Sequence, residues 1–206
     1  MANRFVLNET SYHGKGAISA IADEIKARGF KKAFVCSDPD LIKFGVTKKV
    51  TDILDGADIA YEIYSNIKPN PTIENVQTGV EAFKNAGTDC IVAIGGGSSM
   101  DCAKAVGARI AYPKKSVGKL KGLLKIRRKI PMLIAIPTTA GTGSEVTLAS
   151  VITDSEKQHK YTLMDFNLIP NVAILDPMCT VSLPPHANVW VHTVAKTPKY
   201  VQSQAE

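Results

Sequence analysis

Short apolar runs alternate along the first half of the chain with segments in which apolar residues recur at helical spacing. The pattern predicts strands near 32–36, 59–64 and 89–94, and helices near 43–55, 73–85 and 98–109. Strands and helices that alternate with short links are typical of a mostly parallel sheet covered by helices on both faces. The expected fold class is therefore α/β.

Further elements are expected on either side of this alternating region. They are a short strand at 3–8, a helix over 17–25 that Gly29 ends, strands at 131–136 and 171–175, and a hairpin with strands 147–153 and 160–164.

The strand at 89–94 runs into Gly95-Gly96-Gly97 and then into a helix, whose N-cap is predicted at Ser98 or Ser99. Because glycine has no Cβ, the backbone of such a turn can come within hydrogen-bonding distance of a phosphate, and the first-turn N–H groups of the helix supply donors. The turn therefore indicates a site for the phosphates of a nucleotide. A sharp strand-to-helix corner without a ligand is the alternative.

The usual dinucleotide fingerprint, G-x-G-x-x-G with an acidic residue about 20 residues later, is absent. No glycine follows Gly97 at the required offset, and residues 109–129 contain no Asp or Glu. Asp38, just after the strand at 32–36, is the acid that could hold a ribose, since the carboxyl ends of parallel strands line one crevice. A turn or a helix cap in Ser-Asp-Pro-Asp explains Asp38 equally well.

Two further segments are expected at the same crevice. Residues 138–144, Thr-Thr-Ala-Gly-Thr-Gly-Ser, offer backbone N–H groups and hydroxyls to a ligand rich in acceptors. Asn70 lies between two prolines in a loop that follows a strand, and Lys160 in the hairpin could meet a phosphate or a ribose. Turn formation for Asn70 and a solvated side chain for Lys160 are the alternatives.

Composition excludes several classes of protein. The 206 residues, 45% hydrophobic and 21% charged, suffice for one sizeable core and are unlike a disordered chain. No apolar run is long enough to cross a membrane, and the first residues lack the apolar core of a signal peptide, so the cytoplasm is expected.

The net charge of +6 could indicate a nucleic-acid partner, but eight Lys and Arg residues are concentrated in residues 114–129. No aromatic side chains lie between them to stack bases. This segment is interpreted as a solvated loop or helix face. We expect neither nucleic acid nor a membrane as a partner.

Three segments together resemble the iron-containing (group III) alcohol dehydrogenases. They are Ile94-Gly95-Gly96-Gly97-Ser98 with Asp101 and Lys104, then Ile-Pro-Thr-Thr-Ala-Gly-Thr-Gly-Ser-Glu-Val-Thr at 136–147, then Leu183-Pro184-Pro185. The match extends from about residue 1 to about residue 185, and residues 1–4, 7–10 and 68–72 are similar to one subgroup of the family. The resemblance implies a Rossmann-like N-terminal domain, similar to that of dehydroquinate synthase, that binds NAD(H) against an all-helical, metal-carrying domain.

The resemblance also assigns residues to the cofactor. Asp38 would hold the adenosine ribose and favour NAD over NADP, whereas the pyrophosphate would be received by Gly96, Gly97 and Ser98. The remaining residues expected along the groove are Asn70, Asp101, Thr138, Thr139, Thr142 and Lys160. Close relatives have an asparagine near the nicotinamide where this chain has Ala149, so one contact differs.

The end of the chain departs from the family. The motif Gly-x-Asp-Ala-x-x-His, which supplies two metal ligands, should follow Pro184-Pro185, but residues 186–196 contain no Asp. We therefore predict an NAD-binding α/β domain at 1–185 and a divergent tail at 186–206. His186 and His192 are interpreted as tail residues, no catalytic or metal-ligating residue is assigned, and the family metal, Fe²⁺ or Zn²⁺, is expected only in a full-length form.

The predicted function is that of an NAD(H)-dependent alcohol dehydrogenase or aldehyde reductase of the iron-dependent type, present as its cofactor-binding half and catalytically incomplete. A small alcohol or aldehyde would be the substrate, and the family suggests a homodimer. A non-catalytic nucleotide-binding or interaction module is the alternative, which alcohol oxidation by the chain alone would exclude.

Overall fold

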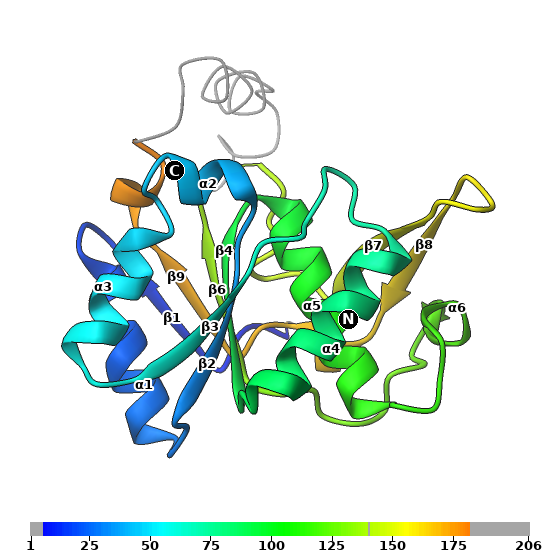
Figure 1. The fold of residues 1–206 in the computed structure, drawn as a ribbon, viewed down its shortest axis with the longest axis horizontal. Helices are drawn as coiled ribbons and strands as arrows, with labels where there is room; N and C mark the ends of the chain where they lie inside the picture. The colour runs from blue at the N-terminus through cyan, green and yellow to red at the C-terminus, as the bar shows by residue number, and fades with distance from the viewer. Residues whose placement is uncertain (1–5, 140, 182–206) are drawn as a thin grey trace, which may run out of the picture.

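The computed structural model describes residues 6–139 and 141–181. Within them, six strands form one sheet in the order β1-β9-β6-β4-β2-β3, and every neighbouring pair is parallel (Figure 1). The strands are β1 (Thr10–His13), β2 (Lys32–Cys36), β3 (Ala60–Tyr64), β4 (Cys90–Gly95), β6 (Leu133–Pro137) and β9 (Val172–Leu175). This sheet confirms the α/β class predicted from the alternating pattern.

Helices cover both faces of the sheet (Figure 1). One face packs against α1 (Ala20–Ala27), α2 (Pro39–Lys43) and α3 (Lys48–Gly56), and the other against α4 (Ile73–Ala86) and α5 (Gly97–Ala111). In β4, Ile91 and Ala93 belong to the core under α4 and α5, whereas Val92 and Ile94 belong to the core under α1 and α3. All four are fully buried, which explains why the sequence of β4 is continuously apolar.

A second, three-stranded sheet lies beside α5 (Figure 1). Its strands β7 (Ala149–Asp154) and β8 (His159–Met164) are antiparallel, which confirms the predicted hairpin, and β5 (Gly122–Leu123) pairs with β8. The short helices elsewhere are α6 (Val117–Leu120), η1 (Ala17–Ser19), η2 (Phe166–Leu168) and η3 (Pro177–Cys179).

The chain changes direction in the sheet between the neighbouring strands β2 and β4. From β2 the chain enters α2 and α3 on one face, whereas from β4 it enters α5 on the opposite face. Because the two connections diverge, they leave a crevice at the carboxyl ends of these strands, which is where ligands bind in open α/β sheets. The fold is therefore Rossmann-like.

Three local predictions were wrong. The first strand of the described residues is Thr10–His13, which pairs with β9. Of the strand predicted at 3–8, residues 3–5 lie outside the described residues, and residues 6–8 are not in a strand; there the side chain of Asn8 donates to the carbonyls of Glu145 and Pro170. The helix predicted at 43–55 is two helices, separated at Gly45, whose φ of 72° ends α2. The N-cap of α5 is Gly96, in extended conformation, so Ser98 and Ser99 lie in the first turn.

Two further predictions concern the lysine-rich segment and the tail of the chain. The lysine-rich segment 114–129 contains α6 and β5, with its Lys and Arg side chains exposed. The tail at 186–206, with His186 and His192, lies outside the described residues. In the part of the chain that is described, no helix is both long and apolar enough to span a bilayer.

Candidate functional site

The turn between β4 and α5 consists of glycines because neighbouring Ser and Thr side chains occupy the positions that a Cβ would need. A Cβ on Gly95 would lie 2.4 Å from the hydroxyl of Ser99, and the φ of Gly95 is 153°. A Cβ on Gly96 would lie 3.3 Å from Thr139 Oγ1, and one on Gly97 would lie 3.1 Å from Thr142 Cγ2. The glycine turn, residues 95–97, therefore packs against the loop that follows β6, whose described residues are 138–139 and 141–144. This loop is called the threonine loop.

This contact follows from the register of the sheet. Gly95 at the end of β4 lies opposite Pro137 at the end of β6, and the N–H of Thr138 donates to the carbonyl of Gly95 at 3.0 Å. The sequence-based hypothesis required these two loops to meet at one edge of the sheet, and the structure confirms that they do.

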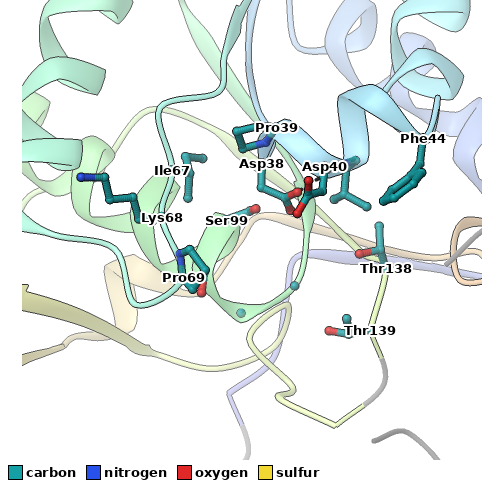
Figure 2. Close-up of a pocket in the computed structure, with 14 residues that line it drawn as sticks. Asp38, Pro39, Asp40, Phe44, Ile67, Lys68, Pro69, Ser99, Thr138 and Thr139 are labelled. Atoms are coloured by element: carbon teal, nitrogen blue, oxygen red, sulfur yellow. Dashed lines mark hydrogen bonds between the residues drawn. The ribbon is translucent and has the colours of Figure 1, made fainter. Parts of the chain in front are cut away.

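A cleft of about 640 Å³ opens at this edge, where β2, β4 and β6 end (Figure 2). Figure 2 shows Asp38 and Asp40 on one side of it and Thr138 and Thr139 on another. Six of the ten residues predicted for the cofactor line it, namely Asp38, Gly96, Gly97, Ser98, Thr138 and Thr139. The cleft thus collects residues that follow four strands, β2, β3, β4 and β6.

Asp38 combines both roles considered from the sequence. Its Oδ1 accepts a hydrogen bond from the N–H of Leu41 at 3.0 Å, so it is the N-cap of α2, and it also lines the cleft. Asp40 lines the same cleft and was not predicted. The Ser-Asp-Pro-Asp sequence contained the signal, since Pro39 begins the helix and places both acids at its first turn.

Asn70, Ser98 and Lys160 come together from three separate segments. Lys160 Nζ donates to Asn70 Oδ1 at 2.9 Å, and the N–H of Asn70 lies 3.4 Å from the hydroxyl of Ser98. Asn70 has a φ of 57°, which asparagine tolerates better than most residues. The hairpin lysine is therefore directed toward the rim of the cleft, and the turn role of Asn70 is also present.

Asp101 is not among the residues that line the cleft. Its Oδ2 accepts from the N–H of Val151 at 3.1 Å, and its Oδ1 accepts from the Ser144 hydroxyl at 3.4 Å. Burial raises the pKa of Asp101, against which these hydrogen bonds act. Asp101 thus connects α5 to β7 and to the threonine loop, of which Thr142 packs over Gly97.

Lys104, on the same face of α5, is fully buried. Its Nζ donates to the carbonyls of Ser144 and Thr147, both at 2.7 Å, and of Ala149 at 3.0 Å, and lies 3.2 Å from the Thr147 hydroxyl. The Lys104 ammonium, which donates to carbonyls, and the Asp101 carboxylate, which accepts from the Ser144 hydroxyl and the N–H of Val151, therefore fix the threonine loop and the start of β7 to α5. Sequence analysis identified Lys104 only as part of a motif, because the carbonyls that it binds lie 40 to 45 residues away in the chain.

The buried ammonium predicts a pH dependence of stability. Burial lowers the pKa of Lys104 to about 8, whereas lysine in an unfolded chain has a pKa near 10.4. Between these values the unfolded chain binds more protons, so this group makes unfolding less favourable as pH rises. The buried thiols of Cys90 and Cys102, whose pKa values burial raises to about 12, act in the opposite direction.

The effect of Lys104 is therefore isolated by comparing the wild type with Lys104→Met. We expect the free energy of unfolding of the wild type minus that of the variant to increase from pH 7.5 to 9.5, by at most about 1.4 kcal/mol per pH unit. Urea unfolding at several pH values measures it. A difference that is constant with pH would contradict the shifted pKa.

No metal centre is formed by the described part of the chain: no group of three or more His, Cys, Asp or Glu side chains in residues 6–139 and 141–181 could hold an ion. His13 contacts Ser11, and His159 packs against Tyr161.

The parallel sheet, the change of direction between β2 and β4 and the cleft beside a glycine turn define a Rossmann-like α/β protein. The family of iron-containing alcohol dehydrogenases matches residues 8–177, and the chain belongs to this family. Lactaldehyde reductase of Escherichia coli (strain K12) is 45% identical over 186 residues, which are 90% of this chain and 49% of that protein. The subgroup suggested by residues 1–4, 7–10 and 68–72 is that of lactaldehyde reductase.

Solved structures of iron-containing alcohol dehydrogenases and related reductases share the fold of this chain. A 1,3-propanediol oxidoreductase superposes with a TM-score of 0.90 at 30% identity, over 95% of this chain and 51% of that one. Sulfoacetaldehyde reductase from Bifidobacterium kashiwanohense, solved in complex with NAD⁺, superposes with a TM-score of 0.82 at 29% identity, over 94% and 51% of the two chains. The chain spans about half the length of these proteins.

Proposed function

We propose that this chain is the cofactor-binding half of an NAD(H)-dependent alcohol dehydrogenase or aldehyde reductase of the iron-dependent type. The observation that carries the proposal is the cleft in which a glycine turn, a helix N-terminus and a threonine loop meet at the point where the sheet changes direction. The NAD⁺ complex of a relative with the same fold supports it.

The residues present fit a pyrophosphate. The first-turn N–H groups of α5 have no acceptor within the helix, and a phosphate oxygen can approach them because Gly96 and Gly97 carry no Cβ. These N–H groups are the donors that a diphosphate would satisfy.

The other cleft residues suit the rest of the cofactor. Asp38 would accept hydrogen bonds from the adenosine ribose, and Asn70 with Lys160 would face the phosphates from the rim. Thr138 and Thr139 would add hydroxyl donors, while Thr142 and Asp101 would keep the threonine loop in place. Each role is one of binding or orientation.

The proposed substrate is a small alcohol or aldehyde, in keeping with the names of the relatives. In this family a bound metal polarises the oxygen of the substrate. The ligands for that metal are not among the residues described here, so the proposal assigns the described residues the cofactor alone. A cytoplasmic location and a homodimer stay predictions.

Titration of the purified chain with NADH and NADPH tests the proposal. Asp38→Ser keeps an N-cap acceptor for α2 but removes the carboxylate, which would repel a 2′-phosphate. We expect the wild type to prefer NADH, and the ratio of NADPH to NADH affinity to rise about 10-fold or more in the variant. Fluorescence of the bound reduced cofactor measures both.

Asp52→Ser is the matched control, since Asp52 is an exposed acid on α3 that pairs with Lys48 outside the cleft. An unaltered ratio in Asp38→Ser would show that the discriminating acid lies elsewhere. No binding of either nucleotide by the wild type would contradict the proposed function. Alcohol oxidation by the chain alone in the presence of ferrous ion would exclude the non-catalytic module.

A further inference from the structure

Asn8, two residues before β1, makes two hydrogen bonds to distant parts of the chain. Its side-chain Nδ2 donates to the carbonyl of Glu145 and to the carbonyl of Pro170, both at 2.8 Å. Because both partners are carbonyl oxygens, the NH₂ group of the amide, and not its oxygen, must face them. One side chain thus joins the segment before β1 to residues that lie 137 and 162 positions later.

Glu145 directly follows the threonine loop, so the contact with Asn8 holds the end of this loop. The carbonyl of Ser144, the last residue of the loop, accepts from Lys104 at 2.7 Å, and the next carbonyl, that of Glu145, accepts from Asn8. Two consecutive carbonyls are therefore held by donors from separate segments, one in α5 and the other before β1.

The threonine loop depends on such contacts for its position. Its described residues lie in bends, turns and irregular structure, so neither a helix nor a sheet ladder holds them. At the start of the loop, the N–H of Thr138 donates to the carbonyl of Gly95, and within the loop Thr142 packs over Gly97. A shift at the end of the loop would therefore change the space over the first turn of α5.

We infer that Asn8 is a positioning residue for the cofactor: by holding the carbonyl of Glu145, it keeps the threonine loop in the conformation that receives the pyrophosphate. This inference rests on the proposed function. Asn8 is not among the residues that line the cleft, so it acts through the loop rather than by touching the cofactor. If the loop adopts this conformation in only a fraction of the molecules, the apparent affinity falls in proportion to that fraction.

Asn8→Ala, which removes both donors, tests the inference by NADH titration and by amide hydrogen exchange of residues 141–148. We expect NADH affinity to fall about 5-fold or more, and exchange in this segment to become about 10-fold faster. The amide of Val146, which donates to the carbonyl of Gly143 at 3.0 Å, is one of those followed. Both measurements are made at a temperature where circular dichroism shows the variant fully folded.

Asn8→Asp separates hydrogen bonding from packing. Aspartate has the size of asparagine, but at about pH 8 it presents a carboxylate to two carbonyl oxygens. If Asn8 acts by donating hydrogen bonds, both effects should be larger in Asn8→Asp than in Asn8→Ala. If it acts by filling space, the order should be the opposite, because alanine leaves a cavity that aspartate fills.

Asn171→Ala is the matched control, because Asn171 also joins the start of the chain to the sheet. Its Nδ2 donates to Glu9 Oε1 at 2.8 Å, and its Oδ1 accepts from the N–H of Leu133 at 3.0 Å, so both contacts lie outside the threonine loop. We expect this variant to lower the melting temperature as much as Asn8→Ala does. Its NADH affinity should stay within about twofold of the wild type, with unchanged exchange in residues 141–148.

Three results would overturn the inference. They are unchanged NADH affinity in Asn8→Ala, effects in Asn171→Ala as large as those in Asn8→Ala, and a smaller effect in Asn8→Asp than in Asn8→Ala. The second would mean that Asn8 only supports the fold. Failure of the wild type to bind NADH would instead contradict the proposed function, and hydrogen exchange would still show whether Asn8 holds the loop, so the two failures are distinct.

Discussion

Gly97→Val is expected to reduce NADH affinity by at least about 100-fold while the fold is kept. A Cβ at position 97 already lies 3.1 Å from Thr142 Cγ2 and 3.5 Å from the Ser144 hydroxyl. The two methyl groups of valine must therefore displace the threonine loop or project over the first-turn N–H groups of α5. Either change removes the space that a pyrophosphate needs. NADH titration followed by fluorescence measures the loss.

The matched control is Gly56→Val, because Gly56 at the end of α3 has no atom within 4 Å of its would-be Cβ. This variant should bind NADH as the wild type does. Overpacking at position 97 should cost about 1–3 kcal/mol of stability, so both variants should show the far-ultraviolet circular dichroism of the wild type. NADH affinity that survives in Gly97→Val would place the phosphates elsewhere.

Lys104→Met is expected to lower the free energy of unfolding by about 3 kcal/mol and the melting temperature by about 10 °C. The ammonium of this fully buried side chain satisfies the carbonyls of Ser144, Thr147 and Ala149. Methionine fills a similar volume but donates no hydrogen bond, so these carbonyls lose their partner in a buried site. Thermal unfolding followed by circular dichroism measures the shift.

Lys119→Met, at an exposed position of α6, is the control and should leave the melting temperature unchanged within error. Because Lys104 fixes the loop that packs over Gly97, the position-104 variant should also bind NADH more weakly at a temperature where it is fully folded. A melting temperature equal to that of the wild type would show that the carbonyls find other donors. The role given to Lys104 would then be wrong.

Local sequence signals were sufficient for most of the fold. The strand β4 and the helix α5 follow from a run of apolar residues, three glycines and an Ala- and Val-rich segment, none of which depends on distant residues. The N-cap of α4 is equally local, since the hydroxyl of Thr72 accepts from the N–H of Asn75 three residues later. The six cleft residues could be placed because parallel strands bring their carboxyl ends to one edge.

The features that could not be predicted from the sequence depend on interactions between distant parts of the chain. Sequence analysis identified Lys104 and Glu145 only as residues of two motifs. The burial of Lys104 and the unsatisfied carboxylate oxygen of Glu145 depend on how the threonine loop packs on α5. The first strand was misplaced because its position is decided by β9, more than 150 residues later. Periodicity cannot report such a pairing.

The pairing of β1 with β9, with Thr10 opposite Val172, joins the first and the last strand of the described residues. During synthesis, β1 leaves the ribosome long before residues 172–175 exist, so its backbone groups on that side have no strand to bond. Contacts between segments so distant in sequence carry a large loop-closure entropy and form slowly. A nascent chain therefore carries β1 as an unpaired strand through most of translation, and this is the interval in which chaperones would protect it from aggregation.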